Sequence, residues 1–177
     1  GAFPLEIHKA GIVEAVRRGV PTTVHAGEWP VDTVKNIDLA VELGASRLGH
    51  AITLCQEPKL MQKVSEQDIA VECCLTSNVG WKVPSYAEHP IRKMFDAGVQ
   101  VSINSDNLLL SGSYKRKATP TGELCKLVQD AGFSWEEAKA VLLNSVSTSF
   151  STRLEDDWLT YYERQLDEAL KAILPGD

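Results

Sequence analysis

Five side chains that could bind a metal or move a proton come directly after hydrophobic segments of the sequence. His25 and Glu28 follow the first such segment, His50 ends the second, and Asp106 with Asn107 ends the fourth. Imidazole and carboxylate groups are ligands that zinc prefers, and a carboxyl group outside the ligand set can act as a general acid or base. Taken singly, each residue could equally be a core or turn residue. Taken together, they predict metal-assisted chemistry at a shared site.

The segments before these residues have the composition of β-strands and alternate with helical segments. The strand ends fall at His25, His50, Asn78 and Asp106, at intervals of 25, 28 and 28 residues. A near-constant alternation of this kind predicts repeated βα units and a parallel sheet. Because α/β folds carry their chemistry at the carboxyl ends of parallel strands, the four strand ends are expected to converge on one site.

Hydrophobic periodicity and the positions of Gly and Pro set the expected bounds of the elements. Strands are expected over 20–25, 46–50, 69–78 and 99–107. Helices are expected over 1–19, 30–43, 57–65, 91–97, 120–131, 134–146 and 155–173. Ser134 and Glu137 have the spacing of a capping box and predict the start of the sixth helix.

The number of strands limits the architecture. A complete (β/α)8 barrel typically needs about 250 residues, whereas this chain has 177. Four strands followed by a helical tail predict either a small open sheet or half of a barrel. No glycine-rich phosphate loop follows the first strand, which an open nucleotide-binding sheet often carries. A half-barrel, forming a single domain over residues 1–177, is therefore the favoured prediction.

Composition and charge restrict the class of protein. The chain is 44% hydrophobic, with a net charge of −6 and a pI near 5.3, which argues against nucleic acid as a partner. The basic cluster at 115–117 is interpreted as a solvated loop. No segment is apolar enough to span a membrane and no signal segment is evident. The four cysteines contain no CxxC pair, which favours reduced thiols and a cytoplasmic protein.

The four strand-end segments, at 24–28, 47–51, 71–78 and 101–107, resemble four successive strands of the adenosine/AMP deaminase family. The order, position and spacing of the segments agree with that family over about residues 1–150. The resemblance implies a (β/α)8 barrel that binds one zinc ion. This chain would then supply the C-terminal half of the barrel, strands 5 to 8, followed by C-terminal helices.

The resemblance also implies a role for each strand end. His25 and Asp106 would be zinc ligands, and His50 would orient or deprotonate the water that zinc activates. Glu28 would donate a proton to N1 of the purine, which requires a pKa raised by burial. The implied reaction is hydrolytic deamination of adenosine or 2′-deoxyadenosine to inosine and ammonia, a step of purine salvage.

Substrate contacts are implied at two further positions. Gly27 would lie in the substrate-binding site, and Asn107 would contact purine N7, to which its NH₂ group can donate. Adenosine is favoured as substrate on the resemblance at Asn107. Adenine, AMP and N6-modified AMP remain alternatives within the family. Zinc barrels that hydrolyse amides or phosphoesters and a non-catalytic nucleoside-binding half-barrel are the alternatives outside it.

Part of the family pattern has no counterpart in the sequence. The family takes two zinc ligands from a His-x-His pair on its first strand, and no such pair occurs here. The remaining histidines, His8 and His89, are expected to be solvated or capping residues. With two ligands where a catalytic zinc needs at least three, the chain alone is expected to be inactive. It is expected to pair with the missing N-terminal half-barrel or with itself, because a half-barrel has two open edges.

Overall fold

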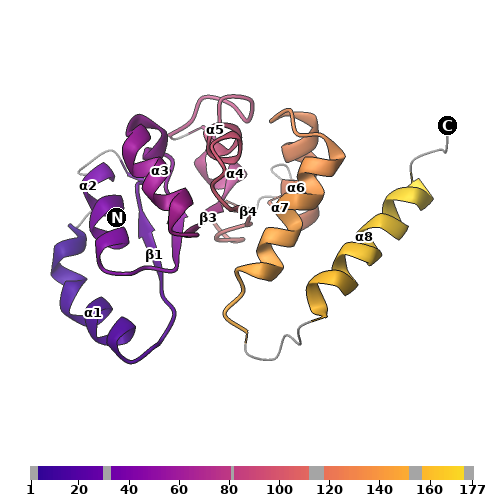
Figure 1. Cartoon of the computed structure of the whole chain (residues 1–177). Helices are drawn as coiled ribbons and strands as arrows, with labels where there is room; N and C mark the ends of the chain where they lie inside the picture. Colours follow the sequence, from indigo (N-terminus) through magenta and orange to yellow (C-terminus); the bar gives the residue numbers. More distant parts are fainter. Residues whose placement is uncertain (1–3, 30–32, 81, 112–117, 152–156, 174–177) are drawn as a thin grey trace.

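Four short parallel strands form the centre of the structure, a computed structural model that describes residues 4–29, 33–80, 82–111, 118–151 and 157–173. They are β1 (Thr23–Ala26), β2 (Arg47–His50), β3 (Ala70–Cys73) and β4 (Val101–Ile103). The strands are hydrogen-bonded in the order β1-β2-β3-β4, all parallel (Figure 1). The predicted α/β class and parallel sheet are therefore confirmed.

Helices connect the strands and continue beyond the sheet. A 3₁₀ turn, η1 (Leu5–His8), leads into α1 (Lys9–Arg17), and a second, η2 (Leu54–Gln56), follows β2. The other helices are α2 (Thr33–Glu42), α3 (Pro58–Glu66), α4 (Leu75–Asn78), α5 (Ile91–Asp96), α6 (Pro120–Gln129), α7 (Trp135–Ser147) and α8 (Trp158–Ile173). Within the described ranges, no helix combines the length and the apolar character needed to cross a membrane.

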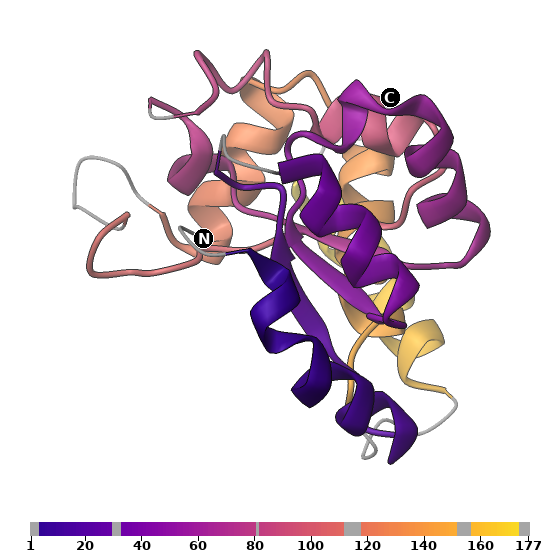
Figure 2. The ribbon, with the colours of Figure 1, turned by 90° about the vertical axis from the view of Figure 1, so that its left-hand side faces the viewer.

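The residues of β1 show how the sheet is covered. Val24 and Ala26 are buried beneath the helical layer, whereas Thr23 and His25 on the opposite face are exposed. Successive strand residues point to opposite faces of a sheet, so the face that carries His25 is open to solvent at β1. Helix α1 runs beside this edge strand (Figure 2).

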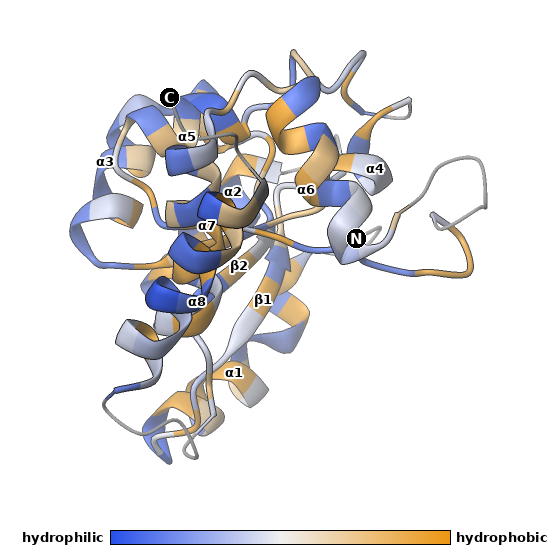
Figure 3. Cartoon of the chain, turned by 90° about the vertical axis from the view of Figure 1, so that its right-hand side faces the viewer, coloured by the Kyte–Doolittle hydropathy of each residue, from blue (hydrophilic) through white to orange (hydrophobic). Residues whose placement is uncertain are grey.

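The core lies between the sheet and its helices. Large side chains from both layers have no exposed surface, among them Ile37 of α2, Leu48 of β2, Val71 of β3 and Met94 of α5. Complete burial of one such side chain contributes roughly 1.5–3 kcal/mol. In Figure 3 hydrophobic and hydrophilic residues both occur along the strands, whereas α8 shows extended hydrophilic stretches. The central sheet is thus held by apolar burial on its helical face.

The helical tail is attached to the last strand. Helix α7 packs against β4 and α8 packs against α7, and Asn144 Nδ2 of α7 donates to the carbonyl of Val101 at 3.0 Å. The capping box predicted at Ser134 and Glu137 is present at the start of α7. These contacts make α7 a part of the sheet's support.

The strands are shorter than the sequence predicts. The segment expected as a strand over 69–78 is a strand only as far as Cys73, and its polar end forms the helical turn α4. The strand expected over 99–107 ends at Ile103, which pairs with Cys73. The basic cluster at 115–117, and the first residues of the helices expected from 30 and 155, lie outside the described residues.

Candidate active site

The ends of β1 and β2 bring two predicted site residues together. The sheet register pairs His25 with Gly49 and Ala26 with His50, and the two imidazole rings meet edge to face with centroids 4.9 Å apart. A Cβ atom on Gly49 would lie 2.9 Å from His25 Nδ1, closer than an ordinary van der Waals contact. The glycine before His50 therefore makes room for the imidazole of His25.

Left-handed backbone is concentrated at the strand ends. His50, Ala51 and Asp106 have φ values of 66°, 43° and 54°, which for non-glycine residues costs of the order of 1–3 kcal/mol each. Gly27 also has a positive φ, of 74°, and a Cβ there would overlap the buried side chain of Ile37. The predicted contact of Gly27 with substrate is not tested by this geometry, which instead gives a steric reason for glycine.

Glu28 lies between a lysine and His50. Its Oε1 accepts a hydrogen bond from Lys82 Nζ, and its Oε2 lies 3.7 Å from His50 Nε2. Lys82 Nζ also lies 4.3 Å from the centroid of the Trp29 ring. The two groups next to the Glu28 carboxylate, the Lys82 ammonium and the His50 imidazole, can both donate hydrogen bonds through nitrogen. Sequence reasoning gave no role to Lys82, which follows α4 in a loop and carries no motif.

Asp106 is held by the turn that follows β3. Ser77 Oγ donates to Asp106 Oδ2 at 2.5 Å, and one ligand atom each of His50, Cys74 and Asp106 lie within 4.8 Å of one another. Burial first, and then the carboxylates of Asp106 and Glu123, raise the pKa of the Cys74 thiol. The buried thiol is therefore neutral and was not predicted as a site residue.

The donor groups gathered here fit a zinc ion in type. Imidazole, carboxylate and thiol are its usual ligands, and His25 adjoins the cluster through its ring contact with His50. The pair His25 and Asp106 supplies two ligands, fewer than the three protein ligands of a catalytic zinc. A metal held by this pair would need further donors.

His50 is buried, and its Nδ1 atom has a protein partner. Its exposed fraction is 1%, and its Nδ1 lies 3.1 Å from Asn78 Nδ2. Burial lowers the pKa of the His50 imidazole, and the carboxylate of Glu28 offsets part of that effect. The ring is consequently neutral near pH 7.

Of the two roles expected for His89, a solvated or a capping residue, the structure shows the capping role. Its exposed fraction is 2%, its Nε2 lies 3.1 Å from Asn78 Oδ1, and its Nδ1 accepts from the backbone N–H of Ile91 at 3.1 Å. The last bond satisfies a free N–H at the start of α5, as a capping residue does. Burial lowers the pKa of His89 to about 3. His8, by contrast, is exposed as predicted.

Asn107 stabilises the turn that follows Asp106. Its Oδ1 accepts from the backbone N–H groups of Leu109 and Leu110 at 2.9 and 3.1 Å. With its oxygen held in the turn, the side chain can offer a ligand its NH₂ donor, the group that the predicted contact with purine N7 requires.

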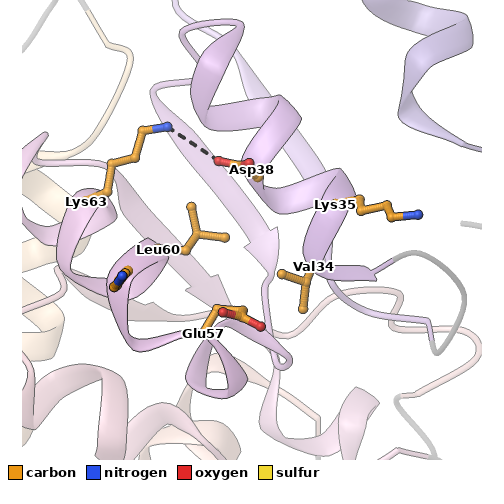
Figure 4. Close-up of a pocket in the computed structure, with 7 residues that line it drawn as sticks. Val34, Lys35, Asp38, Glu57, Leu60 and Lys63 are labelled. Carbon is orange, nitrogen blue, oxygen red and sulfur yellow. Dashed lines mark hydrogen bonds and ion pairs between the residues drawn. The ribbon is translucent and has the colours of Figure 1, made fainter.

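Two pockets differ in their relation to these residues. A pocket of about 360 Å³ beside β1 is lined by His25 together with His8, Ile12 and Asn36. A pocket of about 390 Å³ lies between α2 and α3, where Lys63 forms an ion pair with Asp38 at 3.4 Å (Figure 4). None of the predicted site residues lines the second pocket, so it lies outside the candidate site.

The comparisons with known proteins agree with the family resemblance of the strand ends. The profile of the family described as Adenosine deaminase matches residues 4–160. The chain is 37% identical over 153 residues to an adenosine deaminase of Clostridium acetobutylicum, covering 85% of this chain and 43% of that protein. It is 35% identical over 148 residues to an adenine deaminase of Aspergillus fumigatus, covering 83% and 40%. The chain belongs to the adenosine deaminase family.

Solved structures share the fold. An amidohydrolase from Burkholderia ambifaria with bound Zn superposes with a TM-score of 0.80 at 23% identity, covering 97% of this chain and 48% of that one. An adenine deaminase from Arthrobacter aurescens superposes with a TM-score of 0.78 at 24% identity, covering 96% and 50%. The chain thus spans about half the length of the relatives that it matches.

Proposed function

We propose that this chain supplies the C-terminal half of a (β/α)8 barrel that hydrolyses adenosine or 2′-deoxyadenosine to inosine and ammonia in purine salvage. Four parallel strands in chain order support the barrel assignment, and so does the match to about half of each related structure. The observation that carries the proposal is the convergence of His25, Glu28 and His50 at adjoining strand ends, in a chain related to named adenosine deaminases.

The chain's own residues have distinct proposed roles. His25 and Asp106 would hold a zinc ion, which when bound supplies water activated at neutral pH. Glu28 would hold the proton that N1 of the purine receives, and its carboxylate lies 3.7 Å from His50. Asn107 would donate through its NH₂ group to purine N7, because its oxygen is engaged in the turn.

Zinc binding tests the metal assignment independently of activity. Zinc should be stoichiometric in the barrel-length protein and lost on His25→Ala. The matched control is His8→Ala, which removes the same type of side chain from an exposed position and should leave the zinc content unchanged. Full zinc occupancy in the His25→Ala protein would refute the assignment.

Activity tests the substrate assignment. The barrel-length protein should turn over adenosine in preference to adenine and AMP, each assayed side by side with ammonia release as the readout. Adenine is the second candidate, because a curated relative and a solved structure carry the name adenine deaminase. Preference for adenine would overturn the choice of adenosine, and no turnover of any purine would overturn the reaction.

The chain alone should be inactive with added zinc, since the predicted pair of ligands is incomplete. Turnover by the isolated chain would contradict this reasoning. We further propose that the chain pairs with an N-terminal half-barrel or with a second copy of itself, and a stable monomer on size-exclusion chromatography would oppose that. Its four free thiols support a cytoplasmic location.

A further inference from the structure

A chain of hydrogen bonds through buried side chains connects the start of α5 to the candidate site. The backbone N–H of Ile91 donates to His89 Nδ1, His89 Nε2 contacts Asn78 Oδ1, and Asn78 Nδ2 contacts His50 Nδ1. Each of the three distances is 3.1 Å, and none of the three side chains is more than 2% exposed. The connection is therefore shielded from water over its whole length.

The backbone group at one end fixes the direction of every bond. A peptide N–H can only donate, so Nδ1 of His89 must be an unprotonated acceptor. The buried His89 is neutral because its pKa is lowered to about 3, and its single ring proton must then be on Nε2. That proton requires an acceptor, which turns the oxygen of the Asn78 amide toward His89. A flipped amide would place its NH₂ group against the Nε2–H of His89, with a donor facing a donor.

We propose that Asn78 and His89 are positioning residues that hold His50 in its Nε2–H tautomer. The NH₂ group of Asn78 faces Nδ1 of His50, which accepts the hydrogen bond and so carries no proton. A ring that accepts a hydrogen bond at Nδ1 is not the imidazolium form, so it must carry its proton on Nε2. This nitrogen is the one that faces the site, 3.7 Å from Glu28 Oε2.

The inference rests on the proposed function and decides between the two roles left open for His50. An Nε2–H group can orient an oxygen atom by donating to it, but it has no lone pair with which to accept a proton. It also cannot bind a metal, although His50 lies with Cys74 and Asp106 in the cluster of possible ligands. Histidines that bind metals usually donate their other ring N–H to an acceptor, whereas Nδ1 of His50 faces a donor. His50 is thereby assigned as an orienting hydrogen-bond donor.

Long-range ¹H–¹⁵N correlation spectra of the chain, ¹⁵N-labelled at its four histidines, test the tautomer directly at neutral pH. His50 should show a protonated Nε2 and an unprotonated Nδ1, and His89 should show the same pattern. A proton on Nδ1 of His50 would overturn the proposal without any variant. The spectra need neither substrate nor metal, so failure to turn over adenosine would leave this result unaffected.

The isosteric substitution Asn78→Asp tests whether the chain of hydrogen bonds through Asn78 sets the tautomer of His50. A carboxylate can still accept from His89 but can only accept from His50, so the proton of His50 should move to Nδ1. Asn36→Asp is the control, because Asn36 uses its Oδ1 to accept from Leu5 N–H at 3.0 Å, a bond that aspartate keeps. Retention of the Nε2–H tautomer in Asn78→Asp, or its loss in Asn36→Asp, would refute the role given to Asn78.

Discussion

Substituting Gly27 by alanine should destabilise the chain through two separable effects. Gly27 has φ 74°, and an L-residue in the left-handed region costs roughly 1–2 kcal/mol. The added Cβ would also lie 2.9 Å from Ile37 Cγ1 and 3.0 Å from Thr53 Oγ1. Ile37 is fully buried, so it cannot turn aside, and overpacking of a core costs about 1–3 kcal/mol. The expected loss is therefore about 2–5 kcal/mol.

Gly19 provides the matched control for the backbone effect. Its φ is 71°, but a Cβ there would meet nothing within 4 Å. Gly19→Ala should therefore lose only about 1–2 kcal/mol, and the reduced flexibility of the unfolded chain affects both variants alike. The difference between the two variants isolates the contact with Ile37.

Urea unfolding followed by circular dichroism measures these free energies by linear extrapolation. Ile37→Val, which removes Cδ1 next to the new Cβ, should recover about 1 kcal/mol when combined with Gly27→Ala, after its own effect is subtracted. Equal losses for Gly27→Ala and Gly19→Ala, or no recovery in the double variant, would show that Gly27 is not required by packing against α2. Glycine at this position would then need another explanation, such as the predicted contact with substrate.

Three other predictions concern the supports of the fold. Ser134→Ala removes the cap of α7 and should cost about 1 kcal/mol in urea unfolding; an unchanged midpoint would contradict this. Glu123→Gln should cost about 1.5–3 kcal/mol, because the fully buried carboxylate accepts from both the N–H and the hydroxyl of Thr76; a loss no larger than that of an exposed Glu→Gln change would oppose it. The pKa of His89 falls from 6.5 to about 3 on folding, so the unfolded chain binds the extra proton below pH 6.5 and stability falls as the pH falls. The slope of the free energy of unfolding against pH approaches about 1.4 kcal/mol per pH unit. His89→Gln should reduce this slope, whereas His8→Gln should not.

Local sequence signals located most of the elements but not the ends of the strands. Periodicity and punctuation by Gly and Pro identified the helices, and the family resemblance is confirmed by the profile match. The strand expected over 69–78 ends early because β4 pairs only as far as Cys73. Beyond that point, Thr76 turns to place its N–H on the buried carboxylate of Glu123, a residue 47 positions away. A pattern within one segment carries no information on such a distant partner.

The candidate site is likewise only partly predictable from the sequence. His25 and His50 could be placed together because parallel strands align their carboxyl ends, and the structure has their rings in contact. Lys82 and His89 could not be found, because they lie in the irregular segment after α4 and reach the site through side-chain bonds. A histidine before Pro90 at a helix start was correctly linked to capping. Its buried hydrogen bond with Asn78 is not revealed by sequence spacing.

The strand order of the sheet also has a kinetic consequence. Each strand pairs with the strand before it in the chain, at a separation of about 23 to 30 residues. Among the residues that the structure describes, no later strand inserts between two earlier ones. Closing a loop of this length has a modest entropic cost, which rises only slowly with loop length. The sheet can therefore grow from β1 to β4 in the order in which a ribosome releases the strands. On that route the bond from Thr76 to Glu123 and the packing of α7 on β4 form after the sheet is complete.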